Sequence, residues 1–222
     1  MGSSCRWRPG CRCRSLTRSG TLFRNYTERL SVSATPDRGG PVRADARRNL
    51  DALIDAAKSV FASDGVDAPA KAIADRAGVG VGTLYRHFPQ RSDLVVAVFQ
   101  QAVEACADAA DDLRAAHAPD EALARWLQRF TEFVATKRGL AAALQSGDAA
   151  FEALPAYFIG RLGGTLTELL DAASAAGTVR ADIDAPQLLR AVADLSHGAA
   201  TPEQSQQLVG LLVDGLRYRA TV

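Results

Sequence analysis

Four side chains that can donate hydrogen bonds to phosphate lie within a short stretch of the sequence. They are Thr83, Tyr85, His87 and Arg91, which carry two hydroxyls, an imidazole and a guanidinium. Such groups are common protein donors to the backbone phosphates of duplex DNA. Arg91 would also stand at the start of a helix, whose partial positive charge favours an anion. The four residues therefore predict a surface that contacts phosphate.

Sequence-specific binding also needs groups that reach base edges. The candidates are Lys71, Gly80, Val81, Gly82 and Arg86. Lys71 ranks first, because the glycines on either side of Val81 leave few side chains there that could contact bases. Val81 could touch a thymine methyl group, and DNA shape could add specificity. Arg47 and Arg48 could contribute phosphate or minor-groove contacts.

Two short helices, at 70–77 and 81–88, must position these residues. Gly78-Val79-Gly80 separates them, and Pro89 closes the second. This arrangement is typical of a helix-turn-helix, which sets its second helix in the major groove. A longer helix from residue 44 precedes them, with an apolar stripe at three- and four-residue steps and Gly65 just past its end.

The same residues have other interpretations. Tyr85 could be a core tyrosine with a satisfied hydroxyl, His87 could make a local bond at a helix end, and Arg91 could be a solvated charge. The glycines at 78–82 could suggest a dinucleotide-binding loop. No strand precedes them and the spacing is not G-x-G-x-x-G, so we discard that last interpretation.

The rest of the chain also has helical periodicity, and no convincing strand run occurs. Helices are predicted at 92–116, 120–137, 140–145, 152–176, 185–198 and 202–219. Asp184 and Thr201 are suited to cap the last two helices, and Thr201 with Gln204 could form a capping box. The sequence therefore predicts an all-α fold.

The stretch from Arg47 to Val98 resembles the TetR family of bacterial regulators. Three motifs carry the resemblance: A-A-x-x-V-F-A-x-x-G from Ala56, I-A-x-x-A-G-V-G-V-G-T-L-Y-R-H-F from Ile73, and R-S-D-L-V-x-A-V from Arg91. They cover about a quarter of the chain. Beyond Val98 only the helical layout and the length resemble the family's second domain.

This resemblance implies a three-helix helix-turn-helix domain at 43–91 and a larger helical domain at 92–222 that binds an effector and dimerises. It implies that the family's phosphate contacts fall on Thr83, Tyr85, His87 and Arg91. It also implies a homodimer on a palindromic operator, most often as a repressor, released when a ligand tilts the long helix that joins the two domains.

Bulky apolar stripes in the second domain could line the effector pocket, although for any single residue plain core packing is the favoured interpretation. The candidates are Phe99, Val103, Cys106, Trp126, Phe130, Phe133, Tyr157, Phe158 and Leu162. Few ionisable groups interrupt these stripes. We therefore expect a small, apolar, uncharged effector, and no other cofactor.

The last two helices carry more apolar residues than one core should need. Leu188, Leu189, Val192, Ala193 and Leu195 fall on the first, and Leu208, Val209, Leu211, Leu212, Val213 and Leu216 on the second. A four-helix contact between two copies would bury the excess. We expect the homodimer to form there.

Charge is unevenly distributed along the chain. Residues 1–42 carry eight basic and two acidic groups, 43–91 eight and six, and 92–222 ten and seventeen, so the segments have net charges of +6, +2 and −7. The basic front of the chain suits a polyanion. Residues 1–42 have no apolar period, and we expect a disordered tail there. Their composition could also suit an organellar transit peptide or a basic arm on DNA, and we favour translation from a start codon upstream of the true one.

Several other classes of protein and site are disfavoured. Cys5, Cys11 and Cys13 crowd the N-terminus, far from Cys106, which fits neither a disulfide framework nor a zinc site. No apolar run could span a membrane and no secretory signal opens the chain, so we expect a cytoplasmic protein without a membrane partner.

Two competing functions remain. An enzyme would need catalytic groups, but only His87, His117 and His197 are present, and no serine or cysteine has a recognised nucleophile setting. We expect no catalytic residues and no metal site. A sequence-tolerant architectural protein could instead use the basic tail as an arm on DNA. The sizeable acidic domain argues against that alternative.

Overall fold

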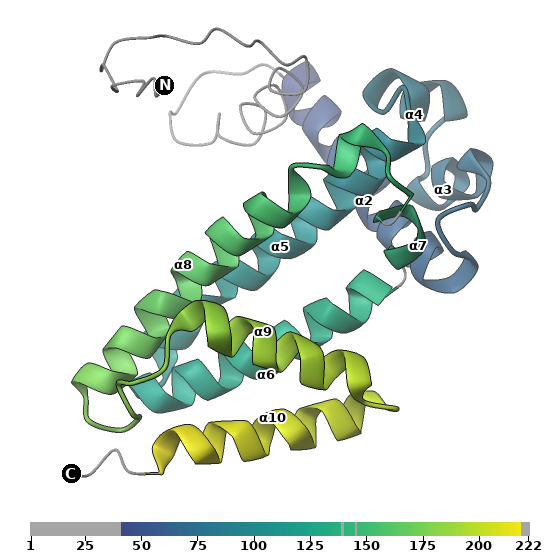
Figure 1. Cartoon of the computed structure of the whole chain (residues 1–222). Helices are drawn as coiled ribbons and strands as arrows, with labels where there is room; N and C mark the ends of the chain where they lie inside the picture. The colour runs from purple at the N-terminus through teal and green to yellow at the C-terminus, as the bar shows by residue number, and fades with distance from the viewer. Residues whose placement is uncertain (1–40, 139, 145, 219–222) are drawn as a thin grey trace, which may run out of the picture. The chain divides into compact units, whose positions relative to one another are not determined.

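The computed structural model describes residues 41–138, 140–144 and 146–218. All regular elements in these ranges are helices, which confirms the predicted all-α class (Figure 1). They are α2 (Pro41–Asp64), α3 (Ala70–Ala77), α4 (Val81–His87), α5 (Arg91–Ala116), α6 (Pro119–Arg138), α7 (Ala141–Leu144), η1 (Ala149–Phe151), α8 (Leu154–Ala175), α9 (Ala185–Gly198) and α10 (Pro202–Arg217).

The predicted tail, 1–42, lies outside the described residues apart from its last two positions, which begin α2. The three N-terminal cysteines lie outside them as well. The described residues group into one compact unit. The boundary at residue 91 between a DNA-binding and an effector domain therefore stays a prediction.

Local capping groups set several of the helix ends. Gly65 follows α2 with a φ of 81°, a left-handed conformation that costs glycine least. The Asp184 side chain caps α9 by accepting a 2.8 Å hydrogen bond from the backbone N–H of Gln187. Thr201 caps α10 in the same way, through the N–H of Gln204 at 3.2 Å.

The capping box predicted for α10 is only half present. The Gln204 side chain does reach back, but its Oε1 accepts from the backbone N–H of Ala200 at 2.7 Å. A reciprocal box would use the N–H of the cap residue, Thr201. Here the backbone N–H of Ala200, the residue before Thr201, is satisfied instead. This hydrogen bond stabilises the bend between α9 and α10.

A small core holds the first helices together. Leu53, Ala57 and Phe61 of α2 are buried with Ile73 and Ala74 of α3. Leu84 of α4, the cap residue Phe88 and Leu94 of α5 are also buried. Small Ala74, with no exposed area, lets the short helices approach closely. α2 packs against both α3 and α5, so this core is continuous with the start of the long helix.

The larger part of the fold is built around α5. α8 runs beside α5 in the same direction, and α6 packs against both, while α9 and α10 form a hairpin that covers α6 (Figure 1). The residues sealed in this core include Trp126, Phe130, Leu123, Leu127, Leu162, Leu166 and Leu169. None of the helices in the described ranges combines the length and apolarity that crossing a membrane requires.

Candidate nucleic-acid interface

The turn between α3 and α4 is built from glycine and backbone hydrogen bonds. Gly78 ends α3 with a φ of 69°, and the N–H of Val79 then donates to the carbonyl oxygen of Ala74 at 3.0 Å. Gly80 is extended and precedes α4, where its carbonyl accepts from the N–H of Thr83 at 2.8 Å. This three-residue turn fixes the angle between two helices, as a helix-turn-helix requires.

The residues predicted to contact DNA lie at or near the surface of this unit. Tyr85 is 54% exposed, a high value for an aromatic side chain. Arg47, Arg48, Lys71, Gly80, Gly82, Arg86 and Arg91 are exposed, whereas Val81, Thr83 and His87 are half-buried. The structure thus leaves these residues accessible, and their contacts with phosphate or bases stay predictions.

The start of α4 is bare of side chains on its outer side. A Cβ atom added at Gly80 or Gly82 would meet no protein atom within 4 Å. Neither glycine is needed for close packing inside the protein, and both have ordinary φ angles. The open space instead lets another backbone or a groove floor approach the N-terminal end of α4.

Lys71 has an ion-pair partner that was not predicted. Its Nζ lies 2.7 Å from the Asp75 carboxylate, one helical turn further along α3, and both side chains are exposed. The four-residue spacing was the signal for this pair. Such a surface pair is weak, so Lys71 can exchange it for a DNA group at small cost. Arg76 is also exposed on α3 and adds a positive charge that was not predicted.

Arg91 has a structural role that its residue type did not reveal. Its guanidinium donates to the carbonyl oxygens of Val66 and Ala68, in the loop between α2 and α3; the bond to Ala68 is 2.7 Å long. Two of its five donors are therefore used inside the protein. A phosphate contact by Arg91 would have to use the remaining donors.

The aromatic residues predicted for the effector pocket come together between α5, α6 and α8. Phe130 and Phe133 lie between Trp126 on one side and Phe158 on the other, with ring centroids 5.7–6.1 Å apart. Phe99 of α5 meets Phe133 edge-on at 6.0 Å. The stripes predicted on three helices thus share one interior, in which these rings pack against one another.

Cys106 and Trp126 join α5 to α6 within this interior. The indole N–H of Trp126 donates a 2.9 Å hydrogen bond to the backbone carbonyl oxygen of Cys106. Burial raises the pKa of the Cys106 thiol to about 12, so the side chain is neutral near pH 7 and behaves as a small apolar group. Val103 of α5 and Leu162 of α8 are also completely buried.

Tyr157 lies in a more polar setting than expected. Its hydroxyl hydrogen-bonds to the Glu104 carboxylate, which also accepts from Arg161 at 2.8 Å. Arg161 bonds to Asp108 as well, at 2.6 Å. The expectation of few ionisable groups is therefore incorrect at this edge of the predicted pocket, where α8 places Arg161 opposite acidic residues of α5.

Gln100 of α5 is a buried polar residue that was not among the predicted site residues. It is 1% exposed, and neither its Nε2 nor its Oε1 has a hydrogen-bond partner among the described residues. The signal lay in the pattern, since Val96, Ala97 and Val103 at helical spacing place position 100 on an apolar face.

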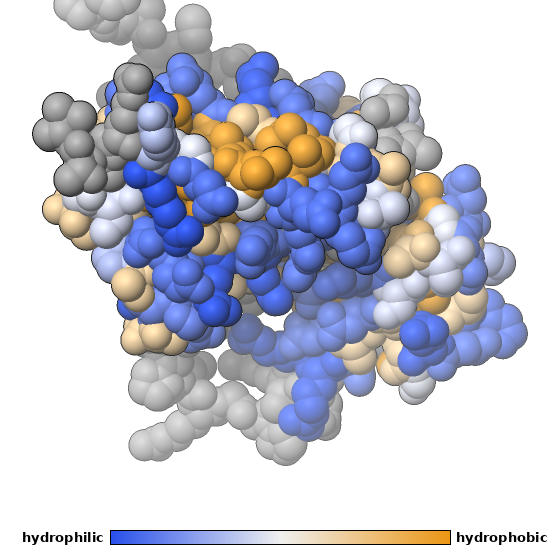
Figure 2. All heavy atoms as spheres, turned by 90° about the horizontal axis from the view of Figure 1, so that it is seen from below, coloured by the Kyte–Doolittle hydropathy of each residue, from blue (hydrophilic) through white to orange (hydrophobic). Residues whose placement is uncertain are grey.

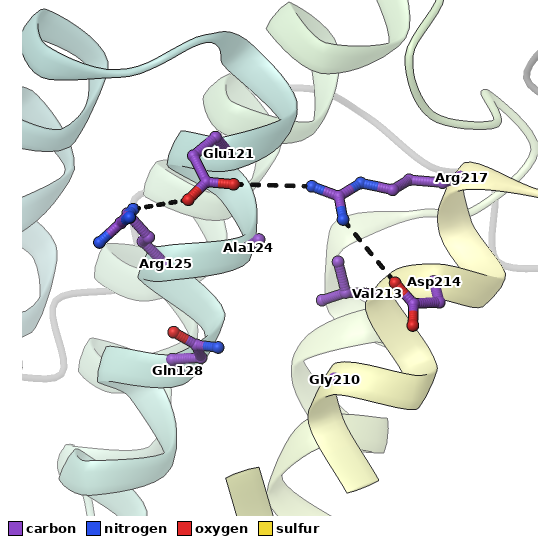
Figure 3. A pocket seen from close by; sticks show the side chains of 8 residues that line it. All are labelled: Glu121, Ala124, Arg125, Gln128, Gly210, Val213, Asp214 and Arg217. Carbon is purple, nitrogen blue, oxygen red and sulfur yellow. Dashed lines mark hydrogen bonds and ion pairs between the residues drawn. The ribbon is translucent and has the colours of Figure 1, made fainter. Parts of the chain in front are cut away.

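A separate surface pocket lies between α6 and α10 (Figure 3). Charged side chains of both helices line it and engage one another: Arg217 lies 3.8 Å from Glu121 and 3.7 Å from Asp214, and Arg125 lies 2.8 Å from Glu121. Arg217 also bonds to Asp120 at 2.9 Å. This pocket differs in chemistry from the apolar site that was predicted, and its ion pairs brace α10 against α6.

No group of three or more potential metal ligands is assembled within the described ranges.

Two family models match the chain. The model of the bacterial regulatory proteins of the tetR family matches residues 53–98, which include α3 and α4. The model of the SbtR-like transcriptional regulator C-terminal domain matches residues 118–218. The two matches fall on the helix-turn-helix and on the larger helical part.

Among known proteins, an HTH-type transcriptional regulator, SAUSA300_2515 of Staphylococcus aureus (strain USA300), is 39% identical over 61 residues, which are 27% of this chain and 33% of that protein. The chain thus spans about a third of the length of the curated relatives it matches.

Two solved structures are similar over much longer stretches. The TetR transcriptional regulator SCO0520 from Streptomyces coelicolor is 37% identical with a TM-score of 0.66, over 75% of this chain and 97% of that one. A TetR transcription regulatory protein from Mycobacterium vanbaalenii is 39% identical with a TM-score of 0.64, over 80% and 99%. Motifs, helix-turn-helix geometry and these matches agree, and the chain belongs to the TetR family of bacterial transcriptional regulators.

Proposed function

We propose that this regulator is a ligand-responsive repressor, which binds a palindromic operator as a homodimer and leaves it when a small, largely apolar molecule enters the interior between α5, α6 and α8. The observation that carries the proposal is a second apolar face on α10, at the far end of a fold whose other end presents an exposed helix-turn-helix.

The apolar face of α10 supports a dimer. Val209, Val213 and Leu216 turn into the core of the chain. Leu208, Leu211, Leu212 and Gly215 recur at three- and four-residue steps on another side, where Leu211 is 70% exposed. Seen from the side on which α10 lies, apolar side chains gather in a patch bordered by hydrophilic ones (Figure 2). A second copy that pairs its own α9 and α10 with this face would bury it in a four-helix contact.

A dimer explains how two short recognition helices could select a site. One α4 is seven residues long, with Gly80 as its N-cap and Gly82 within it, and so offers few side chains to the bases. Two copies related by a two-fold axis would contact two half-sites about 34–36 Å apart, so that their contacts add. A ligand that tilts α5 would then change the separation of the two recognition helices, and one helix-turn-helix would leave its half-site.

The interior between α5, α6 and α8 supports an apolar effector. Its aromatic rings come from three helices, so a molecule inserted among them would change how those helices pack. α5 also begins with Arg91, which is bonded to the loop before α3. A shift of α5 would in this way reach the helix-turn-helix.

A sequence-tolerant architectural role is the second candidate. It would depend on the basic residues 1–42 and would give salt-sensitive binding with little sequence preference. The exposed recognition helix and the acidic second half of the chain favour the first proposal.

A reporter assay in bacteria tests the proposed function. A duplex selected by the purified protein is placed between a promoter and a reporter gene, and the full chain is expressed in the same cells. Repression predicts that reporter output falls, and that a Tyr85→Phe and Lys71→Ala double variant restores it. Unchanged output with the intact chain would contradict the proposal, and increased output would identify an activator.

A further inference from the structure

Gln100 is the most unusual polar group in the described part of the bundle. Its side chain is 1% exposed, and both its carboxamide nitrogen and oxygen lack a hydrogen-bond partner there. Buried polar groups in folded proteins are almost always paired, because leaving water without a new partner destabilises the fold. An unpaired buried carboxamide therefore suggests that something outside the chain completes it.

Helix geometry places Gln100 at the junction of three helices. The preceding residue, Phe99, contacts Phe133 of α6, and Glu104, one turn further along, bonds to Tyr157 and Arg161 of α8. Because successive residues are about 100° apart around a helix, position 100 lies between the face of α5 that carries Phe99 and the face that carries Glu104. The carboxamide therefore belongs to the interior where we propose that the effector binds.

The neighbouring polar groups do not meet the needs of Gln100. Val96, Ala97, Val103 and Ala107 share its side of α5 and are apolar. Both oxygens of Glu104 already accept hydrogen bonds, and Arg161 is bonded to Glu104 and Asp108. An anionic ligand would find no uncommitted cation among these groups, which favours an uncharged one.

We propose that Gln100 is the polar recognition point of the effector site, and that the effector is an uncharged, mainly apolar compound with a primary amide or lactam group. This inference rests on the proposed ligand-responsive function. A carboxamide presents a donor and an acceptor side by side, and another amide with its N–H and C=O on the same side satisfies both through two parallel hydrogen bonds.

The position of Gln100 also suggests how binding would reach the DNA-binding helices. The next residue, Gln101, donates from Nε2 to the Asp55 carboxylate of α2 at 3.3 Å. A ligand held by Gln100 therefore acts on the same turn of α5 that is bonded to α2. A small rotation of that turn would loosen the bond between Gln101 and Asp55 while the bonds between Gln100 and the ligand form.

Binding is tested on the full chain with a panel of five- to nine-membered alkyl lactams and primary alkyl amides. Each lactam is paired with its N-methyl form and each primary amide with its N,N-dimethyl form. These methylated partners have no N–H donor. Calorimetry measures affinity, and fluorescence anisotropy measures release from a selected DNA duplex. We expect at least one unmethylated compound to bind at least about tenfold more tightly than its partner, and Gln100→Met to abolish this preference.

A ligand-free measurement separates this proposal from a trapped water molecule. Gln100→Met removes an unpaired polar group at nearly constant volume, so Tm should rise. If a buried water already satisfied the carboxamide, the substitution would lower Tm and overturn the proposal. Ser205→Ala is the matched control, since the Ser205 hydroxyl is also buried without a partner in the described ranges but lies on α10. It should leave the ligand preference unchanged.

Failure of this inference differs from failure of the proposed function. Release of DNA by apolar compounds such as esters or alkanols, with no amide preference or with a preference that survives in Gln100→Met, would overturn only the role of Gln100. If no compound of any of these classes binds or releases DNA, the effector site itself is contradicted, and the role of Gln100 with it.

Discussion

The guanidinium of Arg91 donates a 2.7 Å hydrogen bond to the backbone carbonyl oxygen of Ala68. Arg91 is the first residue of α5, and Ala68 lies in the loop that leads into α3. A second donor of the same guanidinium binds the carbonyl oxygen of Val66. One side chain thus fastens the long central helix to the loop before the helix-turn-helix, and under the proposed function it would pass a displacement of α5 to α3.

Arg91→Lys should lower the free energy of unfolding by about 1–3 kcal/mol. A lysine ammonium cannot reproduce the planar fork that bonds two carbonyl oxygens at once, so at least one of them loses its partner. Urea unfolding followed by circular dichroism measures the effect. Arg86→Lys is the control, because Arg86 is exposed on α4, and it should change stability by less than about 0.5 kcal/mol. Equal effects of the two substitutions would contradict the role given to Arg91.

Tyr85→Phe and Lys71→Ala should weaken DNA binding in different ways. Loss of the Tyr85 hydroxyl removes a predicted phosphate contact, so binding to all duplexes should fall by a similar factor. Loss of Lys71 should cost about 1–3 kcal/mol at one base position and relax the preference there. Fluorescence anisotropy on a selected duplex and its single-base variants measures both effects.

The pair between Lys71 and Asp75 needs its own control. Lys71→Ala leaves the Asp75 carboxylate alone beside the DNA, and its repulsion would weaken binding without any base contact. A Lys71→Ala and Asp75→Ala double variant removes that repulsion. An unchanged base preference in the double variant would show that Lys71 does not contact a base.

Leu211→Glu should disrupt the dimer. Leu211 is 70% exposed in the described chain, and the proposed contact would bury it, which stabilises a dimer by roughly 1.5–3 kcal/mol. A glutamate there would also lose hydration on association. We expect the dimer Kd in sedimentation equilibrium to rise at least tenfold, as about 1.4 kcal/mol would produce. Gln206→Glu is the control, since Gln206 is exposed on α10 off the apolar stripe. A dimer unaffected by Leu211→Glu would place the interface elsewhere.

The buried Cys106 thiol should make stability fall at high pH. Burial raises its pKa from 9.0 to about 12, so the folded protein holds the thiol proton more tightly than the unfolded chain does. The sign follows: this contribution is complete below pH 9 and is lost as the pH rises towards 12, by up to about 1.4 kcal/mol per pH unit.

Comparison with Cys106→Ala isolates that effect, because every other titrating group is shared by the two proteins. Urea unfolding at several values between pH 7.5 and 10.5 should show wild type losing stability faster above pH 9, whatever the offset at neutral pH. Parallel curves for the two proteins would mean that the thiol ionises as easily in the folded state as in the unfolded chain.

Much of the fold could be predicted because its signals are local. Gly65 and Gly78 are needed where the backbone turns left-handed, and Asp184 and Thr201 begin helices through bonds to residues three positions away. The predicted start of the first helix, residue 44, lies three residues after the observed start of α2 at Pro41. Repetition of apolar residues at helical spacing supplied most of the rest.

The features that could not be predicted from the sequence depend on contacts between residues far apart in the chain. Arg91 meets a carbonyl 23 positions earlier, and Glu104 meets an arginine 57 positions later. Residue type alone predicts a phosphate contact for Arg91 and indicates no role for Glu104. The apolar surroundings of Gln100 were visible in the sequence, but its lack of a hydrogen-bond partner among the described residues follows only from how the helices pack on α5.

Selection of binding sites from random duplex DNA tests the central claim most directly. The purified full chain and a chain that starts at Val42 are compared at near-physiological salt. A dimeric regulator that recognises its operator through α3 and α4 predicts the same palindromic site for both proteins. Recovery of no consensus, or binding by the full chain alone, would contradict it and favour a basic arm that binds DNA without sequence preference.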